Sequence, residues 1–161
     1  MRNFQADLKR GQQGEQDFLK LFTKLVGTDG RKGDILAPDG KIELKTDFYP
    51  MSQTPNFFIE RYSSIEVLSP GGPWQAKAHG CKYFVYYYTS DKQGFVFLVD
   101  DLIVQLEKVE NSLKPIQVRN KKWTTVGYKV PRDIVKPLFS FNGKAEVVAD
   151  EAGMAVATTW K

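Results

Sequence analysis

The stretch GDILAPDGKIELK, residues 33–45, decides the expected fold of this chain. Two short apolar segments, 35–37 and 41–45, flank the triplet Pro38-Asp39-Gly40. Proline followed by aspartate and glycine is a strong turn signal, so the sequence predicts a β-hairpin here. The hairpin carries more charge than a plain turn requires, which makes it a candidate functional element.

The charged residues of the hairpin are Asp34, Glu43 and Lys45. Side chains alternate along a strand, so Glu43 and Lys45 point to one face, and we expect the opposite face to belong to the core. If Asp39-Gly40 forms a two-residue turn, Asp34 lies opposite Lys45 and diagonal to Glu43, with β-carbons somewhat under ~7–8 Å apart. That separation suits two carboxylates that bind one divalent cation.

A helix is predicted before the hairpin. Apolar residues recur at helical spacing from Leu8 to Val26, and Gly27 is a C-terminal stop signal. Glu15 falls on the same stripe as these apolar residues. We therefore expect a carboxylate on the face of the helix that packs inward.

The rest of the chain predicts alternating strands and helices. A third strand is expected at 57–67, a second helix at 74–78 after the breakers at 69–73, and a strand buried on both faces at 82–89. Further expected elements are a strand at 94–100, a helix at 100–111 with Asp100 or Asp101 near its cap, one or two strands within 114–130, and a short helix begun by Pro131. Periodicity is lost from Phe141 onward, so residues 141–161 are expected to be peripheral to a single domain at 1–140.

Composition limits the function classes. The 161 residues suit one domain, and the +4 net charge favours a polyanionic partner only mildly. With a single Cys81 and a single His79, neither an internal disulfide nor a thiolate and imidazole zinc cage is available, so any metal must be held by oxygen. No apolar run is long enough to cross a bilayer and no signal-peptide pattern opens the chain, so we expect a cytoplasmic protein without membrane contact.

Oxygen ligands of this kind favour Mg²⁺, which retains waters and can offset charge that builds on a phosphoryl group. Lys45 beside such an ion could orient or deprotonate an attacking water, or neutralise the transition state. Glu15 could complete the acidic cluster if the first helix packs over this end of the sheet. The competing interpretation is a solvated ion-pair ladder formed by Asp34, Glu43 and Lys45.

The order of Glu15, Gly33-Asp34 and Ile42 to Lys45, followed by strand, helix and strand, resembles the PD-(D/E)XK nuclease superfamily, which includes Holliday-junction resolvases. The resemblance covers about residues 8–89, and Gly33 stands where the motif name has proline. It implies an α/β fold with a restriction-endonuclease-like αβββαβ core, a mixed central sheet flanked by helices, and extra C-terminal strands and a helix. It also implies Mg²⁺-dependent hydrolysis of DNA, for which Mn²⁺ can substitute, with Asp34, Glu43 and the Leu44 carbonyl as metal ligands and Lys45 assisting the nucleophile.

Other polar residues are weaker candidates. Gln75 and Lys77 resemble accessory positions near the phosphate in some members, and Arg31 with Lys32 forms a basic pair expected to bind DNA. Glu60 could approach the site from the third strand, although a carboxylate at a strand edge explains it equally well. Basic residues cluster again at 119–122, where they could grip a phosphate backbone.

The sequence as a whole favours a metal-dependent deoxyribonuclease. Endonucleolytic and structure-selective cleavage is preferred, because no ATPase motif or separate recognition domain is present, and a homodimer would supply two active sites. Restriction-type cleavage and a nuclease of phage or mobile-element origin stay open. The alternative from a different class is a non-catalytic module for binding nucleic acid or protein on a decayed nuclease fold.

Overall fold

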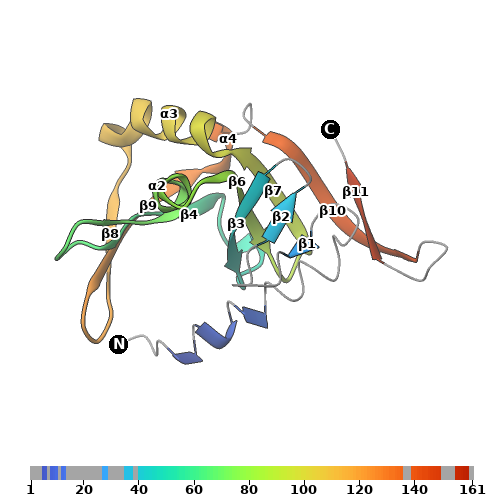
Figure 1. The fold of residues 1–161 in the computed structure, drawn as a ribbon, viewed down its shortest axis with the longest axis horizontal. Coiled ribbons are helices and arrows are strands. Elements are labelled where there is room, and N and C mark those ends of the chain that lie inside the picture. The colour runs from blue at the N-terminus through green and yellow to red at the C-terminus, as the bar shows by residue number, and fades with distance from the viewer. Residues whose placement is uncertain are drawn as a thin grey trace.

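The computed structural model describes residues 5–6, 8–10, 12–13, 27–28, 35–37, 40–135, 139–149 and 155–159. In 27–28, 35–37, 139–149 and 155–159 the structure describes the backbone alone. Across these residues the chain has an α/β architecture, in which a mixed sheet and an antiparallel sheet are flanked by helices (Figure 1). No helix of the described part is long and apolar enough to span a bilayer.

Sheet A is the larger sheet and holds seven strands in the order β1-β2-β3-β6-β7-β10-β11. β3 and β6 run parallel, and every other pair of neighbours is antiparallel. The strands are β1 (Gly27–Thr28), β2 (Ile35–Ala37), β3 (Gly40–Asp47), β6 (Cys81–Tyr88), β7 (Gln93–Leu98), β10 (Phe139–Ala149) and β11 (Ala155–Thr159).

Sheet B is antiparallel and holds four strands in the order β5-β4-β9-β8. These are β5 (Ser69–Pro70), β4 (Asn56–Ser64), β9 (Thr124–Pro131) and β8 (Pro115–Arg119). The helices are η1 (Met51–Gln53), α2 (Gly72–Ala78), α3 (Val99–Val109), η2 (Glu110–Ser112) and α4 (Arg132–Val135). In Figure 1, sheet B extends to the left of sheet A, and α3 lies across the top of the molecule.

The main core lies where sheet B and the helices pack on sheet A. Phe57 of β4 is its centre, with its ring centroid 4.7 Å from that of Tyr86 and 5.2 Å from that of Phe95. Burial of one such ring stabilises the fold by ~1.5–3 kcal/mol relative to exposure. Val85 and Tyr87 point to the opposite face of β6 and are also fully buried. The prediction that this strand is covered on both faces is therefore confirmed.

The predicted hairpin is confirmed, but its register differs from the expected one. β2 and β3 are antiparallel, with Ala37 opposite Gly40 and Ile35 opposite Ile42. The expectation had paired residue 38 with 41, which shifts the ladder by two residues. A Pro-Asp-Gly triplet marks a turn without deciding which two of its residues span the strands, so this error could not be avoided from sequence. The pairing that had placed Asp34 opposite Lys45 is not the observed ladder.

The strand expected at 57–67 is also present, as β4, but it belongs to sheet B and is not hydrogen-bonded to β3. The strands of the expected central sheet are thus divided between two sheets. The second helix, the strands at 82–89 and 94–100, the helix near 100–111 and two strands within 114–130 are confirmed. The last short helix begins at Arg132, one residue later than expected, because Pro131 ends β9.

The ends of the chain are described only in part. The backbone is helical at residues 5–6, 8–10 and 12–13, and the rest of the helix predicted up to Val26 lies outside the described residues. Gly27, predicted as a helix stop, is the first residue of β1. Beyond Phe141, where no periodicity was found, β10 and β11 add an edge to sheet A.

Candidate active site

β3 places the two best-described candidate residues at the margin of the core. Glu43 is paired with Phe84 of β6, and Lys45 is paired with Tyr86. Paired residues of neighbouring strands point to the same face, so Glu43 and Lys45 share the face that carries the aromatic core. The expectation that the chemical and core faces are opposite is therefore wrong for this strand. Both side chains are half-buried, because they lie where the core meets solvent.

A pocket opens at this margin and collects polar groups from three elements. Its volume is about 60 Å³, well below the ~300–1,000 Å³ typical of pockets for organic ligands. It has room for a hydrated cation or a phosphoryl group at the surface, rather than for an organic cofactor. The lining residues are Glu43, Leu44 and Lys45 of β3, Phe58 and Glu60 of β4, Gly72 and Gln75 of α2, and Phe84 of β6.

Glycines at the start of α2 allow this helix to approach β4. A β-carbon at Gly72 would lie 2.5 Å from the Glu60 carbonyl oxygen, and Gly72 has a φ of +49°. A β-carbon at Gly71 would lie 2.8 Å from the Glu60 β-carbon. The backbone N–H of Gly71 also donates to the Arg61 carbonyl at 3.0 Å. Side chains at these positions would push α2 away, so the two glycines bring Gln75 and Glu60 into one pocket.

Lys45 forms the ion pair that crosses the pocket. Its Nζ lies 3.5 Å from Glu60 Oε1, and the two side chains are 32% and 27% exposed. Nζ also lies 5.9 Å from the centroid of the Phe58 ring. A partly solvated pair of this kind contributes only ~0–1 kcal/mol to stability. Lys45 can therefore exchange Glu60 for another anionic partner at small cost, which is unlike the behaviour of a structural salt bridge.

Asp47 follows Lys45 on the same face of β3 and joins the site to the core. The Tyr86 hydroxyl donates to Asp47 Oδ2 at 2.5 Å and accepts from the Phe58 N–H at 3.2 Å. Burial, followed by the Asp47 carboxylate, raises the pKa of Tyr86 well above its usual value, so this hydroxyl remains a donor. The two bonds connect β3, β6 and β4 at Phe58, the residue whose ring lies near Lys45 Nζ.

A second cation holds the other end of the same aromatic cluster. Arg132 donates from Nη1 to the Tyr88 hydroxyl at 3.0 Å, and Tyr88 donates to the Asn56 carbonyl at 3.2 Å. Burial raises the pKa of Tyr88 to about 12, although Arg132 opposes this effect. Arg132, which directly follows β9, thereby ties this end of the chain to β6 and β4.

The structure separates the two accessory residues predicted on the second helix. Gln75 lines the pocket, whereas Lys77 lies 3.1 Å from Asp100 Oδ1 in an exposed ion pair away from it. The other predicted site residues, Glu15, Arg31, Lys32 and Asp34, lie outside the described residues.

Glu60 is the pocket residue that sequence reasoning ranked too low. Its signal was a carboxylate directly after the apolar run 57–59, between the buried Ile59 and the half-buried Arg61. A strand-edge carboxylate has the same pattern. Only the packing of sheet B against sheet A, which brings Glu60 to Lys45, distinguishes a pocket residue from a strand-edge carboxylate.

The oxygen donors of the pocket meet part of what a divalent cation requires. Glu43 and Glu60 offer carboxylate oxygens, Gln75 an amide oxygen and Leu44 a main-chain carbonyl, and Mg²⁺ prefers such hard oxygen ligands with several retained waters. Among the residues that the structure describes, no cluster of three or more His, Cys, Asp or Glu could hold a metal ion. The described donors therefore supply only part of the ligand set of a weakly held, largely hydrated cation. Further carboxylates would complete that set.

Comparisons with known protein families, curated proteins and solved structures gave no match for this chain. The pocket and its residues must therefore carry the functional inference without support from relatives.

Proposed function

We propose that the chain is a Mg²⁺-dependent deoxyribonuclease that hydrolyses phosphodiester bonds at the pocket between β3, β4 and α2. The observation that supports this proposal is the convergence of Glu43, Lys45 and Glu60 on one small, solvent-accessible pocket. Carboxylates of this kind can hold a divalent cation, and an exchangeable ammonium group can offset charge that develops on an anionic ester. The resemblance to the PD-(D/E)XK superfamily, noted from the sequence, is consistent with these roles.

The cation would be held by Glu43 and the Leu44 carbonyl, with Asp34 as the further ligand that the resemblance implies. When bound, it would supply charge neutralisation at the phosphoryl oxygens and a more acidic water. The protein residues provide the remaining functions. Lys45 would break its ion pair with Glu60 and would then bind a phosphate oxygen or hold the attacking water. Glu60, which lies next to Lys45, could accept a proton from that water.

Gln75 and Phe58 would position the substrate. The Gln75 amide can donate to a non-bridging phosphate oxygen without adding charge, and the Phe58 ring lines the same pocket 5.9 Å from Lys45 Nζ. Glu15, Arg31, Lys32 and Lys77 stay predictions as further catalytic or DNA-binding residues. Endonucleolytic, structure-selective cleavage by a homodimer is the form of the activity that we propose.

The test is incubation of the protein with linear, nicked, flapped, single-stranded and four-way DNA in Mg²⁺, Mn²⁺ or EDTA. We expect metal-dependent cleavage of at least one form, and Glu43→Gln should abolish it. Lys108→Ala, which removes an exposed lysine of α3 that does not line the pocket, is the control and should cut at the wild-type rate.

A second readout separates the proposal from its alternative, the non-catalytic binding module. Calorimetric titration with Mn²⁺ should show binding to the wild type and weaker binding to Glu43→Gln. DNA binding without cleavage of any form and without Mn²⁺ binding would favour the module and refute the nuclease.

A further inference from the structure

The β8–β9 hairpin of sheet B carries an unusual concentration of positive charge. Residues 114–130, which form β8, its turn and β9, contain five cationic residues and no aspartate or glutamate. These are Lys114, Arg119, Lys121, Lys122 and Lys129. Figure 1 shows the β8–β9 hairpin extending away from the body of the molecule. We refer to the end of this sheet, residues 64–69 and 119–124, as the arm.

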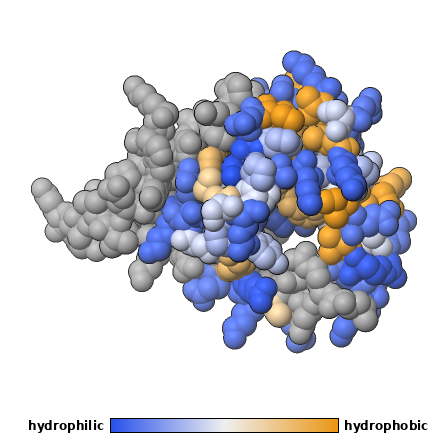
Figure 2. Space-filling view, turned by 180° about the vertical axis from the view of Figure 1, so that it is seen from behind, coloured by the Kyte–Doolittle hydropathy of each residue, from blue (hydrophilic) through white to orange (hydrophobic). Residues whose placement is uncertain are grey.

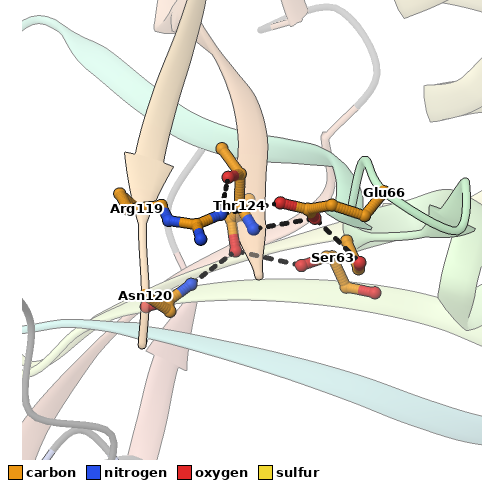
Figure 3. Close-up of polar contacts among 7 residues, drawn as sticks. Ser63, Glu66, Arg119, Asn120 and Thr124 are labelled. Carbon is orange, nitrogen blue, oxygen red and sulfur yellow. Dashed lines mark hydrogen bonds and ion pairs between the residues drawn. The ribbon is translucent and has the colours of Figure 1, made fainter. Parts of the chain in front are cut away.

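The arm is built from two turns held together by one carboxylate (Figure 3). Glu66, in the turn after β4, lies 2.9 Å from Arg119 Nη1 and accepts the Thr124 backbone N–H at 2.9 Å. Ser64 Oγ donates to the same carboxylate at 3.1 Å. Chiefly because of the Thr124 N–H, the pKa of Glu66 falls to about 2, so the carboxylate is ionised at any physiological pH.

A second layer of bonds lies below the carboxylate. Thr125 Oγ1 donates to the Ser63 carbonyl at 3.0 Å and accepts from Asn120 Nδ2 at 3.1 Å. The Ile65 N–H donates to the Thr124 carbonyl at 2.9 Å. Together with Glu66, these bonds hold both turns in one arrangement. The arm is therefore preorganised, which lowers the entropy lost when it binds a partner.

The arm presents two cations that this network does not use. Glu66 neutralises Arg119, whereas Lys121 and Lys122 are exposed and form no ion pair within the described part of the chain. Exposed lysines that form no ion pair within the described residues create a local positive potential that favours a polyanion.

Two apolar residues follow Glu66 in the turn that its carboxylate joins to Arg119 and Thr124. Val67 is 72% exposed and Leu68 is 66% exposed, and Leu68 has a φ of +54°. A left-handed backbone is unfavourable for a bulky residue, and glycine or asparagine would be the usual choice there. Neither burial nor backbone geometry explains leucine at this position. Figure 2 shows further hydrophobic patches, coloured orange, in the half of the molecule that holds sheet B and α3.

Strand β4 links the pocket to the arm. It carries Glu60 in the pocket and ends at Ser64, the first residue of the arm. Four residues of strand span ~13 Å at ~3.3 Å per residue. That length corresponds to about four base pairs at a rise of ~3.4 Å. A duplex laid along β4 could contact both places at once.

We propose that the arm is a DNA-binding element that holds the substrate at least about four base pairs from the cleaved bond. Lys121 and Lys122 bind phosphates, and Val67 and Leu68 contact sugars and partly unstacked bases. The proposal rests on the proposed nuclease function for its substrate. It does not use the pocket residues, so the two proposals can fail separately.

The test is DNA affinity measured between 50 and 200 mM salt, in EDTA to prevent cleavage. Each phosphate contact contributes ~0.9 to the magnitude of the slope of log K against log salt. The Lys121→Ala/Lys122→Ala double variant should lower the slope of log K against log salt by ~1.8 and weaken binding to all DNA sequences alike. Lys121→Arg/Lys122→Arg should retain the wild-type slope, and Lys108→Ala should not change it. Val67→Ser should weaken binding to DNA with unpaired bases without changing the slope.

An unchanged slope in the double alanine variant would overturn the arm proposal, whether or not the protein cuts DNA. Reduced slope together with no cleavage by the wild type would support the arm and refute the nuclease. If the wild type binds vesicles of phosphatidylserine and phosphatidylcholine but no DNA, the arm is a membrane contact and the proposal is wrong. Circular dichroism of each variant checks that the fold is retained.

Discussion

The close approach of α2 to β4 at Gly72 gives the most direct test of how the site is built. Substitution of Gly72 by alanine would place a β-carbon 2.5 Å from the Glu60 carbonyl oxygen, 3.4 Å from its backbone nitrogen and 3.5 Å from its carbonyl carbon. The obstacle is backbone, which cannot rotate away as a side chain can. Gly80, just beyond the other end of α2, has a φ of +73°, and a β-carbon added there would meet no atom within 4 Å, so it provides a matched control.

The two substitutions differ in one physical effect. Both force alanine into the left-handed region, which costs ~1–2 kcal/mol, and both recover ~0.4–1 kcal/mol because alanine restricts the unfolded chain. Gly80→Ala should therefore lower the free energy of unfolding by roughly 1 kcal/mol. Gly72→Ala also has to relieve an overlap with backbone, which adds ~1–3 kcal/mol as overpacking does in cores. We expect a total loss of about 2–4 kcal/mol for Gly72→Ala.

The assay is urea unfolding of both variants, followed by cleavage and Mn²⁺ titration under folding conditions. Because α2 must shift away from β4, Gly72→Ala should also separate Gln75 from Glu60 and reduce cleavage, whereas Gly80→Ala should not. Equal losses of stability, within ~0.5 kcal/mol, would refute the reasoning, since the contact with Glu60 would then have no energetic consequence.

Three further outcomes are expected. Lys45→Ala should bind Mn²⁺ and DNA but cut DNA ~10²–10⁴-fold more slowly in single-turnover assays, whereas a simple surface pair with Glu60 predicts no change in rate. Arg61→Ala should lower the free energy of unfolding by ~1–2 kcal/mol in urea, because Arg61 stacks 4.4 Å from the Trp74 ring centroid and bonds to Glu110. Arg61→Lys should not restore this stability, because lysine lacks the planar guanidinium. Tyr86 has a raised pKa in the fold, so its stabilising contribution is complete below about pH 10 and is lost as pH rises toward the folded pKa. In urea unfolding, the free energy of unfolding should thus fall by roughly 1 kcal/mol less from pH 9 to pH 11 in Tyr86→Phe than in the wild type. Equal falls would contradict the buried-donor role.

Local patterns were enough to place most secondary structure in the middle of the chain. The apolar and aromatic run of β6 required burial on both faces, and the breakers before Trp74 required the chain to stop and restart as a helix. Each of these decisions depends on neighbours within a few residues, through alternation, turn propensity and helix propensity. The same is true of the hairpin between β2 and β3.

The register of that hairpin was not determined locally. Moving the turn by one residue shifts the pairing by two and leaves every side chain on the same face, so alternation cannot distinguish the two ladders. Pairing of Ala37 with Gly40 is decided by the sheet that β3 joins, including its parallel contact with β6.

The partition of strands between two sheets was also beyond local reasoning. β4 has the composition of a central strand, and its pairing with β9 links residues about 70 positions apart in the chain, such as Ile59 with Tyr128. Such pairing depends on which distant strands are available, and the sequence of β4 alone does not determine this.

The sequence by itself determined that Glu43 and Lys45 share one face of a strand, because that follows from the two-residue period of the backbone. Only the tertiary structure decided that this face is also the core face, that Glu60 completes the pair with Lys45, and that Gln75 rather than Lys77 reaches the pocket. The physical reason is that an ion pair or a pocket is made by side chains from separate elements. Their meeting is set by how sheet B and α2 pack on sheet A, and by the space that glycine leaves for that packing.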